Sequence, residues 1–197
     1  MSSENLQTVR IADKTANPAP LGLMGFGLTT MLLNLHNAGF FPLDSSIMAM
    51  GIFYGGLAQV IVGIMEWKKN NTFGTTAFTS YGFFWISLVA IWIMPKLGLA
   101  AAPTEVAMGS FLAVWGLFSF GLFVATFKAT KALSVTFGLL VILFALLTLK
   151  DFTGNPAIGI AAGWSGIFCA LAAMYTAIAQ VINEMWGRVV MPIGPWK

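Results

Sequence analysis

Residues 132–149 read ALSVTFGLLVILFALLTL, a run of 18 residues without a charged side chain. A helix needs about 20 mainly apolar residues to cross the hydrocarbon core of a bilayer, so this run is long enough to span it. Such runs are too long and too continuously apolar for the alternating strands of a membrane β-barrel. Further charge-free stretches lie at 15–43, 45–65, 70–95, 106–127 and 152–183. The sequence therefore predicts an all-α, polytopic membrane protein.

The overall composition favours the same class. Of the 197 residues, 58% are hydrophobic and 9% are charged, against roughly 45–50% and about 25% in soluble domains. This excludes a soluble catalytic or nucleic-acid-binding domain, and we expect no nucleic-acid partner. The formal net charge of +3 is small, and its carriers flank the apolar runs, where they contact membrane lipid. The single cysteine, Cys169, cannot form an intrachain disulfide.

Six transmembrane helices account for the apolar runs. We expect residues 18–182 to form the six-helix transmembrane domain, preceded by a cytoplasmic N-terminal tail at 1–17 and followed by a cytoplasmic C-terminal tail at 183–197. The N-terminal tail lacks the order of a cleavable signal peptide, so the first helix is retained. The expected spans are 18–36, 47–65, 73–94, 106–126, 132–149 and 158–182.

Basic residues fix the expected orientation. Cytoplasmic loops of membrane proteins carry an excess of Lys and Arg, and here the bias is eight to two. Both termini are therefore expected in the cytoplasm, with the first, third and fifth helices parallel, in a multi-pass protein of the cell inner membrane. The tails and the second and fourth loops carry Arg10, Lys14, Lys68, Lys69, Lys128, Lys131, Arg188 and Lys197, whereas the other loops carry Lys96 and Lys150.

Two Asn-Pro-Ala boxes precede expected helices. At Asn17-Pro18-Ala19, Asn is a favoured N-cap and Pro fits the first helical turn. A positive helix end exposed to a cavity also attracts carboxylates, which makes Asn17 a candidate pathway residue. The second box, Asn155-Pro156-Ala157, completes a pair like that of aquaporins, whose boxes lie on half-helices that meet at the bilayer centre. Helix caps are the favoured interpretation here, and a channel for water or small neutral solutes is an alternative.

Ionisable residues are expected away from the membrane centre. All 7 carboxylates fall in tails, loops or helix ends, so no proton relay is evident and channel-like conduction is favoured over proton coupling. His36, the single histidine of the sequence, is expected at the outer end of the first helix, where it is either solvated or a pH sensor. Thr30 and Gln59 either donate hydrogen bonds to a passing solute or join helices. We expect no metal site, no cofactor and no enzymatic activity.

Small residues recur at the spacing that lets helices approach closely. Gly51 with Gly55, and Gly159 with Gly163, are both GxxxG pairs. Packing within one six-helix bundle is the favoured interpretation of each pair. Contacts between subunits, or a pore lining, are the alternatives, and they keep open a non-transporting membrane scaffold as a further function.

The first box belongs to a longer motif, which continues to Gly27 as NPAPLGLMGFG. Matching segments follow at 34–37 (NLHN), 51–56 (GIFYGG), 71–74 (NTFG), 78–82 (FTSYG) and 183–184 (NE). Together they resemble the acetate uptake transporter family, which includes bacterial succinate-acetate permeases and fungal acetate/ammonia relatives. The resemblance implies a six-helix protomer, assembled into a hexamer, in which each protomer has its own pathway for acetate and related small carboxylates such as succinate.

The resemblance also implies a narrow point formed by a Phe, a Tyr and a Leu, which match Phe26, Tyr81 and Leu140; a shift of one residue would choose Leu139 instead. The three lie on the helices that the charge bias makes parallel, each about eight residues beyond its start. At 1.5 Å per residue they reach a common depth of about 12 Å in a core about 30 Å thick. We expect one hydrophobic constriction, with the Tyr81 hydroxyl available to a carboxylate; three packed core residues are the alternative.

Overall fold

The computed structural model describes residues 15–196; residues 1–14 of the expected N-terminal tail, and Lys197, lie outside the described residues. The described part is helical, without a strand, which confirms the all-α prediction. The segments α2, η1 and α3 follow one another without a break and together form the second expected helix. The elements are α1 (Ala19–Asn37), α2 (Ser45–Ile52), the π-helix η1 (Phe53–Ala58), α3 (Gln59–Lys68), α4 (Thr72–Ile93), α5 (Glu105–Thr126), α6 (Lys131–Thr153) and α7 (Pro156–Trp186).

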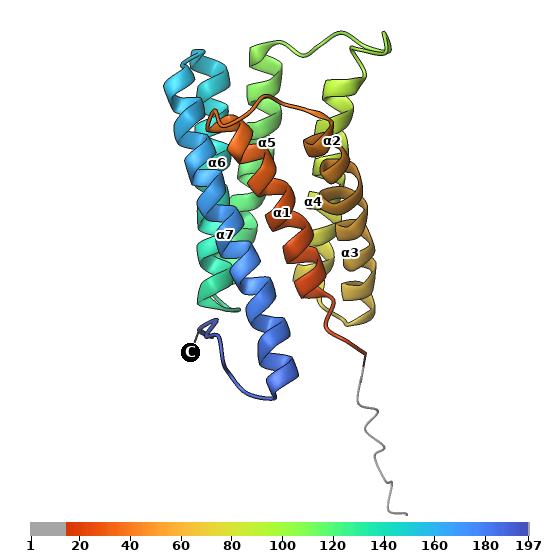
Figure 1. The fold of residues 1–197 in the computed structure, drawn as a ribbon, viewed down its shortest axis with the longest axis vertical. Helices are drawn as coiled ribbons and strands as arrows, with labels where there is room; N and C mark the ends of the chain where they lie inside the picture. Colours follow the sequence, from red (N-terminus) through yellow and green to blue (C-terminus); the bar gives the residue numbers. More distant parts are fainter. Residues whose placement is uncertain (1–14, 197) are drawn as a thin grey trace, which may run out of the picture.

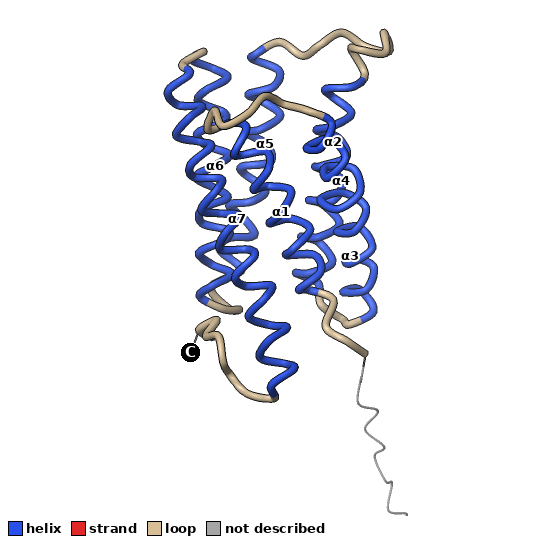
Figure 2. Tube along the Cα trace, viewed as in Figure 1, coloured by secondary structure: helices blue, strands red, loops and turns tan. Residues whose placement is uncertain are grey.

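The helices lie side by side along the long axis of the molecule (Figure 1). α1 packs against α7 on one side and against η1 and α3 on the other, while α6 packs against both α5 and α7. Loops and turns gather at the two ends of the bundle (Figure 2). α1, α4 and α6 begin at one end, and α5 and α7 begin at the other. This up-and-down arrangement is the one that short connections impose on antiparallel neighbours.

Both Asn-Pro-Ala boxes start ordinary helices. Asn155 Oδ1 accepts a hydrogen bond from the Ala157 backbone N–H at 3.0 Å, and α7 begins at the intervening proline. Asn17 Oδ1 accepts from the Ala19 N–H at 3.1 Å, one residue earlier than the standard cap position of α1. The boxes stand at opposite ends of the bundle (Figure 1). The N-cap prediction is confirmed at Asn155, whereas the N-cap of α1 is Pro18, without a side-chain cap hydrogen bond. The half-helix arrangement of aquaporins is absent from the described residues.

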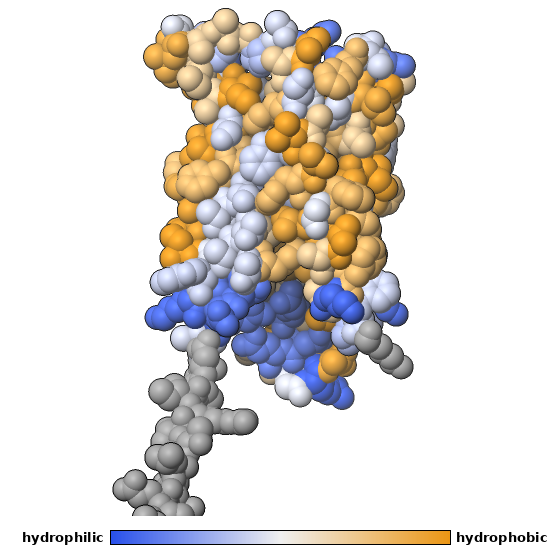
Figure 3. Space-filling view, turned by 180° about the vertical axis from the view of Figure 1, so that it is seen from behind, coloured by the Kyte–Doolittle hydropathy of each residue, from blue (hydrophilic) through white to orange (hydrophobic). Residues whose placement is uncertain are grey.

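Five segments are long and apolar enough to cross a membrane: Ser45–Lys68, Thr72–Ile93, Glu105–Thr126, Lys131–Thr153 and Pro156–Trp186. α1 is not among them, because polar side chains crowd its last turn, at Asn34, His36 and Asn37. On the face drawn in Figure 3, apolar residues cover most of the flank of the bundle, and hydrophilic residues gather at the end where α4 and α6 begin. The surface thus matches a bundle placed across a bilayer.

The small-residue pairs pack inside this chain. A Cβ added to Gly55, in η1, would lie 2.8 Å from Cγ2 of Thr29, so the Thr29 side chain of α1 packs directly on the backbone of the π-helix. A Cβ at Gly163 would lie 2.8 Å from the Cα of Ala38, just beyond the end of α1. Packing within the bundle, the favoured interpretation of both pairs, is therefore what the structure contains. The π-helical stretch itself was not expected from the sequence.

The C-terminal segment folds back instead of continuing away from the bundle. α7 runs to Trp186, so the expected tail at 183–197 begins inside this helix. The indole N–H of Trp196 donates to Ser134 Oγ at 2.9 Å, and the backbone N–H of Lys131 donates to the Gly194 carbonyl at 2.6 Å. The last described residues therefore cover the start of α6.

Candidate functional site

Two cavities enter the bundle from opposite ends. One, of about 820 Å³, lies where α1 ends and α7 begins, and we call it the outer cavity after the expected orientation. The inner cavity, of about 170 Å³, lies where α1, α4 and α6 begin. Both linings contain Phe26, Tyr81 and Leu140, and no other described residue lines both. We call these three residues the narrow-point trio, because the two cavities meet at them.

The trio is buried and comes from three helices that start at the same end. Phe26, Tyr81 and Leu140 are 8%, 3% and 3% exposed. They lie 7, 9 and 9 residues beyond the starts of α1, α4 and α6, respectively. The rings of Phe26 and Tyr81 are 6.0 Å apart between centroids. Leu139, the alternative match, lines neither cavity. The structure thus brings together the residues that the sequence singled out.

The hydroxyl of Tyr81 has a partner in the protein. It lies 2.8 Å from Ser119 Oγ, and the Ser119 hydroxyl donates to the carbonyl of Trp115 at 2.7 Å. A carbonyl only accepts, so the Ser119 hydrogen is used there and Tyr81 donates to Ser119. The expected donation from Tyr81 to a substrate carboxylate therefore requires this bond to break. Ser119, on α5, holds the Tyr81 ring in place across the narrow point, a role that the sequence did not reveal.

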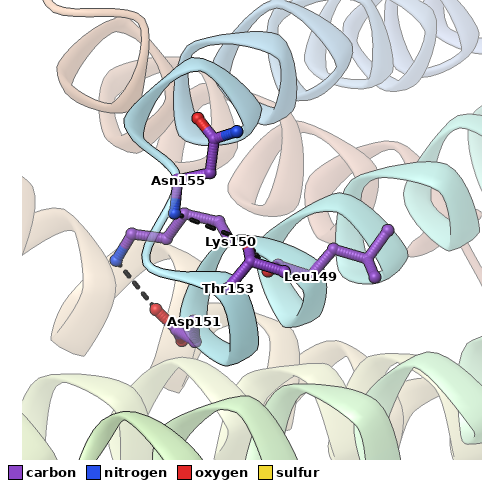
Figure 4. A network of polar contacts seen from close by, with 5 residues as sticks. All are labelled: Leu149, Lys150, Asp151, Thr153 and Asn155. Atoms are coloured by element: carbon purple, nitrogen blue, oxygen red, sulfur yellow. Dashed lines mark hydrogen bonds and ion pairs between the residues drawn. The ribbon is translucent and has the colours of Figure 1, made fainter.

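Charged residues surround the outer cavity. Lys96, Glu105, Lys150 and Asp151 belong to its lining. Lys150 Nζ lies 2.8 Å from Asp151 Oδ1, and the two side chains are 47% and 9% exposed. Figure 4 shows this pair at the end of α6, beside the turn into α7. The ion pair partly neutralises the Lys150 charge that an approaching anion would meet.

His36 also lines the outer cavity, and its Nδ1 lies 2.9 Å from the carbonyl oxygen of Phe41. This bond ties the ring to the loop between α1 and α2. Asp44 caps α2 nearby, and its Oδ1 accepts from the Ser46 hydroxyl at 2.6 Å. That hydrogen bond, followed by one from the Ile47 N–H, lowers the pKa of Asp44 below its usual value. Asp44 therefore stays charged at the outer mouth at neutral pH.

The candidate pathway residues separate by location. Thr30 lines the outer cavity and Gln59 the inner one. Gln59 is 1% exposed and donates from Nε2 to the Gly55 carbonyl at 2.6 Å, so it also secures the end of η1. Asn17 lines neither cavity, but its Nδ2 donates at 3.0 Å to Oε1 of Gln180, which lines the inner one. Asn17 therefore contacts the lining of the inner cavity without belonging to it.

Two carboxylates at helix ends are more buried than the sequence suggested. Glu66, near the end of α3, is 2% exposed, and its Oε2 accepts from Asn71 Nδ2 at 2.7 Å. Asp151 is 8% exposed. Both lie outside the central layer that holds the narrow-point trio. Among the described residues, no group of three His, Cys, Asp or Glu could hold a metal ion.

Apolar helices, and two cavities that meet at three buried side chains, define a multi-pass membrane protein with a candidate solute pathway. The chain belongs to the GPR1/FUN34/yaaH family, whose model matches residues 4–195. It is 56% identical over 181 residues to the succinate-acetate/proton symporter SatP of Escherichia coli strain K12, covering 92% of this chain and 96% of that protein.

Two further comparisons extend this result. Acetate permease A of Emericella nidulans is 36% identical over 206 residues, which cover 94% of this chain and 69% of the permease. A solved structure described as the bacterial acetate channel SatP superimposes with a TM-score of 0.91 at 56% identity, covering 92% of this chain and 100% of that one. These relatives are named as transporters or channels, and the predicted family resemblance is confirmed.

Proposed function

We propose that this chain carries acetate and related small carboxylates, succinate among them, across the membrane within each protomer. The observation that carries the proposal is the meeting of the outer and inner cavities at Phe26, Tyr81 and Leu140. The names of the similar proteins supply the substrate class. The proposed path involves no covalent chemistry, so the protein is a transporter and not an enzyme.

The narrow-point trio sets selectivity in this proposal. A constriction formed by two aromatic rings and a leucine loses its water readily and rejects large or strongly hydrated solutes. A small carboxylate passes once hydrogen bonds from neutral groups, such as Thr30 and Gln59, replace part of its hydration. Lysines at the inner end raise the local concentration of anions, over the 8–10 Å or so that salt screening permits. They are Lys68, Lys69, Lys128 and Lys131.

In this proposal the chain has six transmembrane helices, of which α1 is the first. The protein lies in the inner membrane of the cell, and both termini are in the cytoplasm. α1 is 19 residues long and packs between α7 and the continuous helix of α2, η1 and α3, which we call the α2–α3 rod. Its polar last turn is therefore partly covered by protein. The residues at 1–17 and 183–197 then belong to the cytoplasmic side. Assembly into a homo-oligomer, a hexamer by family resemblance, completes the proposal.

The orientation is testable with terminal tags. Because eight of ten Lys and Arg residues lie on the proposed cytoplasmic side, a tag before Met1 and one after Lys197 should both resist protease added outside sealed spheroplasts. Both should be digested once the membrane is permeabilised, which serves as the control. Digestion of either tag in sealed spheroplasts would overturn the proposed topology and the common depth of the trio.

The function is tested by solute uptake into liposomes that contain only this protein. Acetate should enter faster than in protein-free liposomes, while water permeability, measured by stopped-flow light scattering, should stay at the protein-free level. Fast water entry with no acetate entry would favour a water channel. Uptake of neither solute by correctly folded protein would favour a scaffold.

A further inference from the structure

The residues that follow α7 form a strap at the inner end of the bundle. We define the strap as residues 188–196, which come after Gly187, the C-cap of α7. Gly187 has a φ of 61°, in the left-handed region that favours glycine, and the chain turns sharply there. Figure 1 shows the segment returning from the end of α7 toward the start of α6. The strap is therefore attached to the bundle at two places, α7 and α6.

The last turns of α7 hold the first part of the strap. Oδ1 of Asn183 accepts hydrogen bonds from the backbone N–H groups of Val190 and Met191, at 2.7 and 2.9 Å. Nδ2 of Asn183 donates to the Met191 carbonyl at 2.7 Å. The hydroxyl of Tyr175, also on α7, donates to the Pro192 carbonyl at 2.9 Å. Asn183 is the first residue of the Asn-Glu segment in the family resemblance, and these three bonds give its side chain a role.

The last part of the strap pairs with the segment that leads into α6. Thr130 and Pro195 form an antiparallel bridge. Two backbone hydrogen bonds flank this pair, from the Lys131 N–H to the Gly194 carbonyl at 2.6 Å and from the Trp196 N–H to the Ala129 carbonyl at 3.4 Å. Thr130 and Pro195 are therefore a non-hydrogen-bonded pair, whose Cα atoms lie about 4.5 Å apart in antiparallel ladders.

The residue between these two attachments reaches the inner cavity. Ile193 lines this cavity together with Leu133 of α6 and Gln180 of α7. The inner cavity measures about 170 Å³, against about 820 Å³ for the outer one. The strap thus contributes a wall to the smaller of the two cavities, on the side of the narrow-point trio that faces the inner end of the bundle.

We propose that the strap is the inner gate of the pathway. When it is docked, Ile193 narrows the inner mouth, and when it lifts about Gly187 the mouth opens. The strap suits this motion because backbone hydrogen bonds hold it while many of its side chains stay in contact with solvent; Val189 is 75% exposed. Elements with few buried apolar contacts open more readily than packed helices. The inference concerns regulation of the proposed pathway and rests on the proposed function.

A disulfide at the bridged pair should lock the gate closed. The expected Cα separation of about 4.5 Å lies within the range of about 4.4–6.8 Å that disulfides span. In the full chain with Cys169→Ala, the double variant Thr130→Cys/Pro195→Cys should take up acetate into liposomes about tenfold more slowly when oxidised than when reduced, because the lock removes the lifted state. Each single-cysteine variant should give the same rate with and without oxidant. Undiminished uptake with the disulfide verified by mass spectrometry would overturn the gate.

A thiol in the inner cavity reports on the strap without relying on transport. Ala77 lines this cavity and is 3% exposed, so Ala77→Cys in the Cys169→Ala background places one thiol behind the strap. In nanodiscs, adding Asn183→Ala should speed its modification by a charged methanethiosulfonate reagent about tenfold, because the loss of strap hydrogen bonds raises the lifted population. Glu184→Gln, at the neighbouring exposed position, is the matched control and should stay within about twofold of the parent.

The two measurements separate failure of the gate from failure of the transport function. If liposomes with the parent protein take up no acetate, the proposed function fails, and the thiol reaction then tests the strap by itself. If the parent takes up acetate while Asn183→Ala and Glu184→Gln leave the same thiol reaction rate, the gate alone fails.

Discussion

Phe26→Ala and Leu140→Ala should admit carboxylates that the parent protein rejects. Each variant removes most of a side chain that lies between the outer and inner cavities. The constriction that limits solute size therefore widens. Flux of butyrate relative to acetate should rise about tenfold or more, the scale on which a fitted apolar pocket discriminates one or two methylene groups. The measurement is uptake of a series of straight-chain carboxylates into liposomes.

Leu143→Ala is the matched control for this prediction. Leu143 lies on the same helix as Leu140, is 5% exposed, and lines the outer cavity only. It should lose a comparable amount of stability, on the order of 2–4 kcal/mol for a buried leucine, without a change in size selectivity. If Phe26→Ala and Leu140→Ala keep the parent's size cutoff, the trio is core packing and solute passes elsewhere.

The second large expected effect is on acetate accumulation under a pH gradient, which depends on whether transport is coupled to protons. The trio contains no acid or histidine, and the buried carboxylates Glu66 and Asp151 lie toward opposite ends of the bundle. An ionisable group near the bilayer centre is the usual sign of a proton relay. We therefore expect channel-like conduction of the carboxylate anion, with any apparent proton coupling arising from undissociated acetic acid that permeates the lipid.

A pH gradient distinguishes the two mechanisms when the membrane potential is clamped to zero. In protein-free liposomes with an alkaline interior, permeation of acetic acid alone accumulates acetate about tenfold per pH unit. A channel lets the anion leak back, so the protein should bring this ratio close to one. A symporter with one proton per acetate would preserve the tenfold ratio and reach it sooner, and that result would overturn the channel mechanism. His36→Gln should behave as the parent in this assay.

Much of the fold was predictable because the bilayer restricts the options. The six expected spans differ from the helix bounds of α1, the α2–α3 rod, α4, α5, α6 and α7 by at most four residues at any end. Long apolar runs, Asn-Pro starts and glycine stops are local signals. The π-helix η1 (Phe53–Ala58) was not predictable, because a single turn of i→i+5 bonding inside an α-helix is rare and nothing in the sequence analysis separated it from an α-helix. The docking of Trp196 on Ser134 joins residues 62 positions apart and has no local signal either.

The candidate site was likewise predictable only in part. Phe26, Tyr81 and Leu140 were candidates because the family resemblance implied a narrow point of a Phe, a Tyr and a Leu, and a common depth was compatible with it. The structure places the three side chains together. Ser119 was missed, because only the packing of α4 against α5 shows which hydroxyl meets Tyr81. A serine or tryptophan within an apolar run is normally interpreted as a packing residue, and only its hydrogen bonds in the structure can show another role. The cytoplasmic orientation, the hexamer and the roles of the site residues remain predictions.

The most direct test of the proposed pathway blocks it at the trio. Cys169, the single cysteine of the sequence, is fully buried. Its replacement by Ala gives a cysteine-free protein into which one thiol can be introduced. In that background, Leu140→Cys should transport acetate until a small methanethiosulfonate reagent modifies the thiol, and uptake should then fall to the level of protein-free liposomes. Reduction of the mixed disulfide should restore it. Full modification, verified by mass spectrometry, with undiminished acetate uptake would contradict a pathway that passes Phe26, Tyr81 and Leu140.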